Sequence, residues 1–372
     1  MESVKSPFIS VIAAVYNGEE YLRLAMESVL NQSFKDIEFV IVDDCSTDQT
    51  PAIIASYRDS RIVYIRNPMN LGQTPSLNVA LNAAKGKYIA RMDADDIYLP
   101  GKLEKQYEFM EEHPDIAVSG TAGIKIDEEG NEISVYSPPS SFRDAYFNIF
   151  FRSPLIHVSV ICRRSALVEM GGYDEKYPFR ADFALWSKLV INHYKITSIK
   201  DKLIKYRELT CSPSHPQKLF SLGQETAEIL YSNISTLLDI PFTKQECKEI
   251  VFMLIPSSGI GVQALAGVYL NLRKIAKKAY SGYIPPRISL MLTSMLFWSV
   301  AKRCVYLKSQ GQALFFFRDF YTVSKYFFKD PAVPVLYVGA NVVGLAEDHN
   351  LFLIKKYMAK YVFKIFYRKK AG

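Results

Sequence analysis

Three carboxylates lie within four positions of the chain, inside the segment Lys87–Pro100 (KYIARMDADDIYLP). Asp93, Asp95 and Asp96 directly follow a short apolar run that is typical of a β-strand. Neighbouring acids repel one another, so this spacing gains nothing from packing alone. A divalent cation would remove the repulsion, because hard cations such as Mg²⁺ or Mn²⁺ prefer carboxylate oxygens. The alternative is that Asp96 caps a helix expected to begin near Pro100.

The elements around these acids alternate between strands and helices. This alternation predicts an α/β fold with a parallel sheet, in which ligands lie beyond the carboxyl ends of the strands. Asp43 and Asp44 follow the second expected strand as Asp93 and Asp95 follow the fourth, so two acidic clusters are expected on one rim. The expected strands are residues 8–15, 37–42, 62–65 and 88–90, and the expected helices are residues 19–32, 50–57 and 74–84.

Several function classes are disfavoured by missing patterns. No GxGxxG follows the first expected strand and no GxxxxGK[ST] occurs, which argues against a dinucleotide fold and a P-loop. The five cysteines are scattered without a CxxC pair, which argues against a zinc site or a disulfide framework and fits a reducing compartment. No signal peptide is recognised at the N-terminus, so we expect a cytoplasmic protein. No nucleic-acid motif is found, and no nucleic-acid partner is expected.

Three segments resemble the family 2 glycosyltransferases of the bacterial surface-polysaccharide type, which have a GT-A fold: SVIAAVYNGEEYLRLAMESVLNQSF, FVIVDDCSTDQT and NLGQTPSLNVALNAAKGKYIARMDADD. The resemblance implies a Rossmann-like, mostly parallel sheet flanked by helices. It also implies that Asp93 and Asp95 form the DxD motif, which holds Mn²⁺ or Mg²⁺ against the diphosphate of a sugar nucleotide, with Asp95 as the direct ligand. Asp44 matches the acid that accepts a hydrogen bond from the base, and Tyr16 the aromatic side chain that packs against it. Cys45 is a departure, since the family most often has Gly or a small polar residue there.

The segment Pro154–Leu189 resembles the acceptor half of the same family. Its GGxD turn is intact, but the position of the family's ED pair reads Ala181-Asp182, so one acid is missing. We assign Asp182 as the catalytic base that deprotonates an acceptor hydroxyl as it attacks the anomeric carbon. The resemblance implies inversion at that carbon. The open alternative is that Asp182 caps a helix over residues 183–191.

Other polar residues have weaker claims to function. His157 lies in an apolar run, which favours a core histidine over a substrate contact. Arg163 and Arg164 flank an expected strand and are interpreted as solvated rather than as diphosphate ligands. The segment Lys205–Arg207 resembles the family's closing YR segment, which contacts phosphates from a mobile loop. The QxxRW pattern of processive members is absent here, which predicts a non-processive enzyme.

The resemblance covers residues 7–207. We therefore expect a GT-A domain over residues 1–212, with a nucleotide-sugar-binding half at 1–100 and an acceptor half at 101–212. Residues 213–372 are expected to form an α-helical, basic and aromatic C-terminal region.

Basic charge is concentrated at the end of the chain. The whole chain has a formal net charge of +7, while residues 290–372 contain thirteen Lys/Arg and four Asp/Glu, so the part before residue 290 carries about −2. Residues 351–370 combine an apolar helical face with lysines, which is typical of a helix in a membrane interface, although a helix docked on the protein is equally compatible. The apolar stretch Ile250–Leu272 is interpreted as two packed helices and not as a membrane span. These features predict a peripheral location on the inner face of the cell membrane.

Together these observations predict an inverting, non-processive, metal-dependent glycosyltransferase. The expected donor is a nucleotide sugar with UDP as its nucleotide. The expected acceptor is a hydroxyl of a glycan or lipid-linked glycan in cell-surface polysaccharide synthesis. An inactive, scaffold-like relative that binds membrane or partner proteins is the alternative outside enzymes. A nucleotidyltransferase is the alternative within enzymes, but the Gly-rich basic loop expected after its first strand is absent. The oligomeric state is not predicted.

Overall fold

The computed structural model describes residues 7–150, 152–208, 216–237 and 243–253. The chain divides into two compact units, Met1–Leu237 and Leu238–Gly372. The first unit therefore includes α8 (Pro216–Leu237) in addition to the residues expected in the GT-A domain. Of the second unit the structure describes α9 (Lys244–Met253). The stretches 254–272 and 351–370, for which helices were expected, lie outside the described residues.

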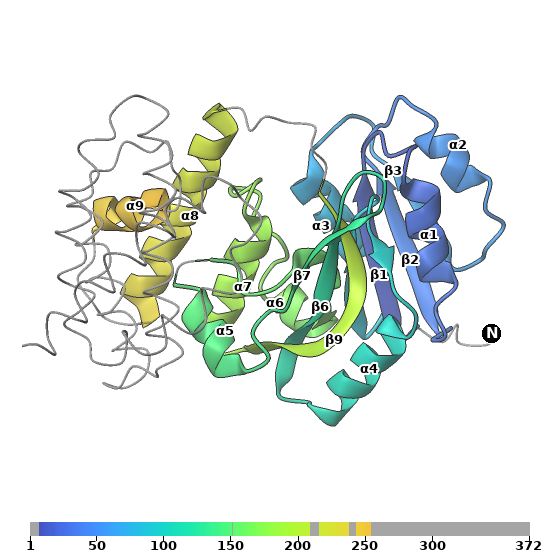
Figure 1. The fold of residues 1–372 in the computed structure, drawn as a ribbon. Coiled ribbons are helices and arrows are strands. Elements are labelled where there is room, and N and C mark those ends of the chain that lie inside the picture. The colour runs from blue at the N-terminus through green and yellow to red at the C-terminus, as the bar shows by residue number, and fades with distance from the viewer. Residues whose placement is uncertain (1–6, 151, 209–215, 238–242, 254–372) are drawn as a thin grey trace, which may run out of the picture. The chain divides into compact units, whose positions relative to one another are not determined.

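A single mixed sheet organises the first unit (Figure 1). Within the described residues its strand order is β3-β2-β1-β4-β8-β6-β9-β5, with β7 paired to β6. The strands are β1 (Ile9–Val15), β2 (Ile37–Asp43), β3 (Ile62–Arg66), β4 (Tyr88–Met92), β5 (Ile97–Tyr98), β6 (Ile116–Ile126), β7 (Glu132–Tyr136), β8 (Ile161–Arg163) and β9 (Lys195–Arg207).

Helices cover this sheet. Those of the first unit, besides α8, are α1 (Leu22–Leu30), α2 (Thr50–Ala55), α3 (Gln73–Ala83), α4 (Lys102–Glu112), α5 (Phe142–Asn148), the 3₁₀ turn η1 (His157–Ser159), α6 (Arg164–Glu169) and α7 (Ala181–Ile191). The helices and strands expected from the sequence before residue 100 are all present, with ends that differ by a few residues. The expected α/β class is confirmed.

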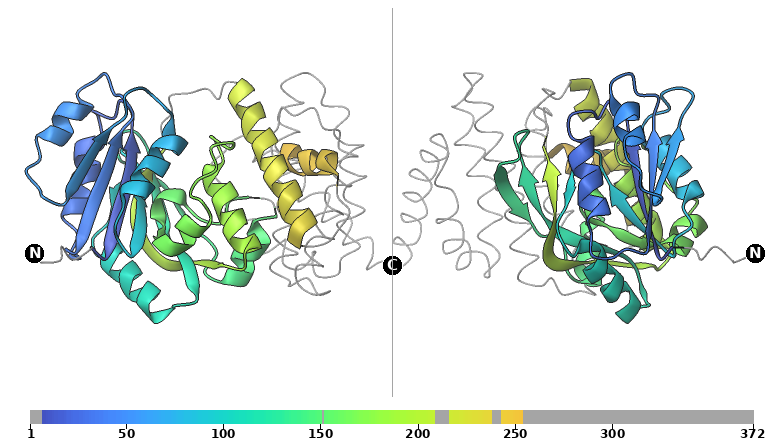
Figure 2. Two further views of the ribbon diagram at one scale, coloured as in Figure 1. Left: turned by 180° about the vertical axis from the view of Figure 1, so that it is seen from behind. Right: turned by 90° about the vertical axis from the view of Figure 1, so that its right-hand side faces the viewer.

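The parallel part of the sheet is the half that was expected to bind the nucleotide sugar. β1 lies between β2 and β4 and runs parallel to both, and β2 is parallel to β3. Every residue of β1 is buried, as expected for a strand covered on both faces. Figures 1 and 2 show α1 and α3 on opposite sides of these strands.

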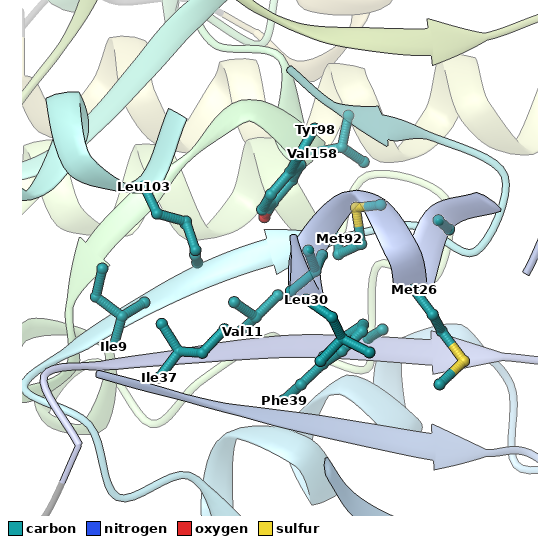
Figure 3. Packing of buried hydrophobic residues seen from close by; sticks show 14 of the residues in the cluster. Ile9, Val11, Met26, Leu30, Ile37, Phe39, Met92, Tyr98, Leu103 and Val158 are labelled. Atoms are coloured by element: carbon teal, nitrogen blue, oxygen red, sulfur yellow. The ribbon is translucent and has the colours of Figure 1, made fainter. Parts of the chain in front are cut away.

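The main hydrophobic core lies under α1. Alternate residues of β1, such as Ile9 and Val11, point to the same face and pack with Met26 of α1 and Phe39 of β2 (Figure 3). Leu103 of α4 closes the same core. These side chains are almost fully buried, so the strands that end at the rim are held by apolar packing and not by the polar groups at their ends.

The second half of the sheet departs from a simple parallel order. β8 pairs antiparallel with both β4 and β6, while β6 and β9 form a long parallel pair. β5 and β7 are attached antiparallel to β9 and β6. β9 ends beside β5, which follows β4 in the chain. The end of β9, far away in sequence, is thereby brought to the acids that follow β4.

None of the helices within the described residues is long and apolar enough to cross a membrane.

Candidate active site

Both acidic clusters lie at one end of the parallel strands. The register places Asp43 beside Val15, the last residue of β1, and Met92 beside Ala13. The acids that follow β2 and β4 therefore flank the residue that follows β1, which is Tyr16. This common rim was expected from the strand ends. The Tyr16 side chain is 51% exposed, so its ring is available to a ligand.

The loops after β1 and β2 are fastened to each other by backbone-to-side-chain hydrogen bonds. The Asn17 amide donates to Ser46 Oγ at 3.0 Å, and the Gly18 amide donates to Thr50 Oγ1 at 2.8 Å. A Cβ at Gly18 would lie 2.7 Å from a methyl carbon of Val15, so a larger residue would push the loop away from β1. These contacts fix the backbone on which Tyr16 is carried.

Asp44 is a buried carboxylate with several hydrogen-bond donors. Its Oδ1 accepts from Asn67 Nδ2 and from the Leu71 amide, and its Oδ2 accepts from the Gly72 amide, each at 2.8 Å. Burial alone would raise the pKa of Asp44, but these donors outweigh it and lower the pKa below its ordinary value. Asp44 is thus an ionised acceptor that also holds the loop preceding α3.

This loop links the two acidic clusters. Asp44 binds the amides of Leu71 and Gly72, and the next residue, Gln73, donates from Nε2 to Asp93 Oδ1 at 3.1 Å. Gly72 has φ +92°, a conformation that favours glycine. Three consecutive residues thus contact acids of both clusters.

The DxD segment has fewer donors around it. Asp93 forms an ion pair with Arg91 of β4, whose side chain is 1% exposed. The Asp95 carboxylate accepts no side-chain or backbone hydrogen bond from another described residue. Burial, followed by the charge of Asp93, raises the pKa of Asp95 to about 6. Burial and the charges of both neighbours raise the pKa of Asp96 as well.

Arg207, at the end of β9, holds this segment in place. Its amide donates to Asp96 Oδ1 at 2.8 Å and its Nε donates to the Asp95 carbonyl at 3.1 Å. Its Nη1 donates to the carbonyls of Asp127 and Glu128. In this chain the segment that resembles the family's YR segment is part of a strand, because β9 continues through Arg207 and the Arg207 guanidinium is bound to backbone carbonyls.

Asp93 and Asp95 suit a hard divalent cation by their chemistry. Two carboxylates repel each other in a partly buried position, and Asp95 lacks a donor from a neighbouring residue, so an external positive charge would relieve both costs. Within the described residues no group of three or more His, Cys, Asp or Glu side chains is arranged to hold a metal ion. The remaining ligands would have to come from a substrate or water, as is usual for Mg²⁺.

Asp182 lies in the first turn of α7. The N-cap position belongs to Arg180 and makes no side-chain cap, so the alternative of Asp182 as the N-cap is wrong. Ser153 Oγ donates to Asp182 Oδ2 at 2.9 Å. Asp182 is thus held by a residue from the segment after α5.

A partly buried polar pair, His157 and Tyr173, interacts electrostatically with both Asp182 and Asp93. His157 Nε2 lies 3.0 Å from the Tyr173 hydroxyl oxygen. Burial, and then the positive charge of Arg91, lowers the pKa of His157 to about 4, while the charges of Asp182 and Asp93 oppose this. His157 is therefore a neutral, partly buried histidine that pairs with Tyr173 and lies within electrostatic range of the acids of both halves.

Two further expectations are corrected by the structure. Asp96 does not cap the helix after Pro100, because α4 begins after Gly101 and Asp96 receives the amide of Arg207 instead. Arg163 is only partly exposed, and its guanidinium binds the carbonyls of Met110 and His113 at the end of α4 and of Ile116 at the start of β6.

Four site residues were not identified from the sequence: Asn67, Gln73, Arg91 and Ser153. Arg91 was the one with a visible signal, since a charged residue inside an apolar strand requires a partner, and the nearest acid is Asp93. Asn67 and Ser153 contact their acids across 23 and 29 positions of the chain, and no local pattern encodes such contacts.

The mixed α/β sheet with acids at the ends of β2 and β4 is compatible with the expected fold, and comparison with known proteins shows the family. The sequence model of Glycosyl transferase family 2 matches residues 10–170. An uncharacterized glycosyltransferase of Methanocaldococcus jannaschii is 39% identical over 206 residues, which is 54% of this chain and 71% of the relative. The chain belongs to glycosyl transferase family 2 and is a glycosyltransferase.

Two further proteins resemble this chain, one in sequence and one in structure. An Escherichia coli enzyme named UDP-Glc:alpha-D-GlcNAc-diphosphoundecaprenol beta-1,3-glucosyltransferase WfaP is 30% identical over 215 residues, covering 54% of this chain and 82% of the relative. The crystal structure of S. aureus TarS 1–349 in complex with UDP-GlcNAc superposes with a TM-score of 0.52 at 22% identity, covering 82% of this chain and 92% of the other. The second similarity is one of fold.

Proposed function

We propose that this enzyme transfers one sugar per encounter from a UDP sugar to a hydroxyl of a glycan or lipid-linked glycan, with inversion at the anomeric carbon. The name of the E. coli relative supports both the nucleotide and the lipid-linked acceptor. A further relative, of Erwinia amylovora, is named an amylovoran biosynthesis glycosyltransferase and supports a role in surface polysaccharide synthesis; it is 31% identical over 202 residues, covering 53% of this chain and 75% of its own length.

The observation that carries the proposal is that the acids of the site have different surroundings, which suit them to different roles. Asp44 is ionised and fixed beside the exposed ring of Tyr16, which suits a flat base with an N–H donor. Asp93 and Asp95 lie on the other side of the β1 end; Asp93 is paired with Arg91, whereas Asp95 accepts no hydrogen bond from another described residue. Asp182 lies in the other half of the unit, at the start of α7.

In the proposed mechanism Tyr16 packs on the base and Asp44 accepts its N–H. Asp93 and Asp95 would hold Mn²⁺ or Mg²⁺, which supplies positive charge to the leaving diphosphate. Asp182 removes the proton of the acceptor hydroxyl as the hydroxyl attacks the anomeric carbon from the opposite side. Loss of the acid at position 181 does not remove this base, since one positioned carboxylate suffices.

The location and domain plan are part of the same proposal. We place the enzyme on the inner face of the cell membrane, attached through the basic residues near the C-terminus, with residues 1–212 as the catalytic domain and 213–372 as a helical region. Truncation after Gly311 is expected to release the protein from membranes, as measured by sedimentation with vesicles. Continued sedimentation of the truncated chain would contradict this attachment.

The function is tested by a thermal-shift screen of nucleoside diphosphates and their sugars, each with and without Mn²⁺. A ligand that binds the folded state raises the Tm, so a true donor raises it only with metal. Asp95→Ala should abolish this rise. Asp182→Asn should keep the rise but lower metal-dependent turnover of the donor by orders of magnitude. No shift with any nucleotide, or normal turnover by Asp182→Asn, would contradict the proposal.

A further inference from the structure

Asp182 is held at one of its two carboxylate oxygens. Ser153 Oγ lies 2.9 Å from Oδ2 and 3.3 Å from the Leu155 carbonyl oxygen, and we assign its one hydrogen to the nearer, charged acceptor. Among the described residues no other side chain or backbone amide donates to this carboxylate. The adjacent position is Ala181, which is buried and offers no polar atom. The only donor that orients Asp182 in the described part of the chain is thus a neutral hydroxyl.

We infer that Ser153 is the positioning residue of the base, and that it presents Asp182 Oδ1 to the attacking sugar hydroxyl; this inference rests on the proposed function. With Oδ2 occupied, Oδ1 is the oxygen left to accept a proton. The proton of the sugar hydroxyl moves to Oδ1 while the hydroxyl oxygen forms the new glycosidic bond, and the bond from the anomeric carbon to the diphosphate breaks.

Neighbours of both partners of this hydrogen bond make further contacts. On the Ser153 side, Arg152 Nε donates to Asn148 Oδ1 at 2.7 Å, and Leu155 is buried. On the Asp182 side, α7 is held by its buried Trp186. A hydrogen bond between two fixed segments restricts the rotation of the carboxylate, which is what orientation of a base requires.

Helix α8 forms hydrogen bonds with Ile149, four residues before Ser153, and with α7, which carries Asp182. Asn233 of α8 donates from Nδ2 to the Ile149 carbonyl at 2.7 Å and to Ser187 Oγ at 2.9 Å. Ile149 belongs to the segment that leads to Ser153, and Ser187 belongs to the helix of Asp182. One buried amide thereby ties together the two segments whose side chains meet at the base.

The hydroxyl also suits the charge state of a base. A donor to a carboxylate favours the ionised form, whereas a second acid beside it would raise its pKa by repulsion. The titratable groups that face Asp182 are His157 of η1 and Tyr173 after α6, and Arg91 and Asp93 act on His157 from the end of β4. A change of Ser153 leaves all four in place, so its effect on the base is measured separately from theirs.

The test uses the full chain with the donor and metal identified by thermal shift. Ser153→Ala should lower kcat about tenfold, the loss of one hydrogen bond to a charged group. The KM for the donor and the donor-induced Tm rise should not change, because Ser153 is not placed at the donor. The acid limb of the kcat–pH profile should move to higher pH, and Ser153→Thr, which keeps a hydroxyl, should restore both.

Ser141→Ala is the matched control. Ser141 Oγ donates to Asp144 Oδ2 at 2.8 Å at the start of α5, so the same kind of pair is lost away from the base. It should leave the kcat–pH profile unchanged. Should Ser153→Ala fail to fold, Ser153→Cys, a poorer donor of similar size, should show the same displacement of the acid limb.

The outcomes separate this inference from the proposed function. If Asp182→Asn abolishes turnover while Ser153→Ala retains the wild-type kcat and pH profile, the positioning role is overturned and the proposed function stands. If Asp182→Asn turns over normally, the base of the proposed function is overturned, and the inference with it. If Ser153→Thr behaves like Ser153→Ala, the hydroxyl is not what orients the base, and the inference is overturned.

Discussion

The two acidic clusters of the rim lie on either side of the end of β1, but they differ in their hydrogen-bond donors and in the direction of their pKa shifts. Asp44 accepts three hydrogen bonds from the loop before α3, and these donors lower its pKa. Asp95 accepts none from another described residue, and burial together with the charge of Asp93 raises its pKa to about 6. Sequence spacing alone makes the two clusters look alike.

The difference in donors shows which of the carboxylate charges the fold itself stabilises. At Asp44 the favourable partners are part of the chain, so folding without a ligand already gains their interaction. At Asp95 the chain offers Arg207 and Arg91, whose charges lower its pKa but do not offset burial. The charge of Asp44 is therefore stabilised by the fold itself, while the charge of Asp95 is not offset by the partners that the described chain supplies.

The largest effect is expected from Asp44→Asn. The substitution removes a buried charge from three donors and places an amide NH₂ against some of them, which should lower the free energy of unfolding by about 3 kcal/mol. Urea denaturation at neutral pH measures it. Because the folded pKa of Asp44 is depressed, its contribution is fully present above the unfolded value of about 3.9 and is lost as pH falls through the folded pKa.

The difference between Asp44→Asn and the wild type should therefore shrink below about pH 4. Asp59→Asn is the control, since Asp59 pairs with Arg61 at a partly exposed site and should contribute no more than about 1 kcal/mol. Equal losses at Asp44 and Asp59 would mean that the hydrogen bonds around Asp44 do not distinguish it from a surface acid.

The opposite sign is expected from Asp95→Asn. In the metal-free protein at pH 7.5, the substitution removes a buried charge that burial and Asp93 disfavour, so the free energy of unfolding should rise by about 1–2 kcal/mol. Urea denaturation in the presence of a chelator measures this. The same variant should lose the metal-dependent rise of Tm with the donor. A variant less stable than the wild type under these conditions would remove the contrast between the clusters.

The position of the two clusters on one rim was accessible from the sequence, but the contrast between them was not. Apolar runs such as Phe8–Val15 and Ile37–Val42 are too short for helices and too uniformly apolar for exposed strands. Their ends therefore place Asp44 and Asp93 on one rim. What spacing does not encode is which donors meet each acid.

The contacts that distinguish the clusters join residues far apart in the chain. Arg207 binds the DxD segment across 111 positions, and it does so because β9 crosses the sheet to pair with β5 and β6. Arg163 was expected to be solvated because it flanks a strand, but β8 lies inside the sheet and directs its guanidinium to the carbonyls at the end of α4. Such outcomes depend on strand order, which local periodicity does not determine.

The smallest effect is expected from Cys45→Gly, at the position where the chain departs from its family. Cys45 has φ 63°, a left-handed conformation that costs a residue with a Cβ about 1–2 kcal/mol. Glycine removes this cost but loses more chain entropy on folding, so the net gain in the free energy of unfolding should be about 0.5 kcal/mol. Thermal and urea denaturation of the metal-free protein measure it.

Cys45→Ala is the matched control, because it removes the sulfur and its weak contact with the Pro68 carbonyl but keeps the Cβ. A gain with glycine and none with alanine assigns the strain to the backbone. Since the strained residue directly follows Asp44, such a result would mean that the hydrogen bonds around Asp44 hold the turn in a conformation that its own sequence disfavours. If alanine stabilises as much as glycine, the backbone at position 45 is not strained. The hydrogen bonds around Asp44 would then impose no conformational free-energy cost on the turn.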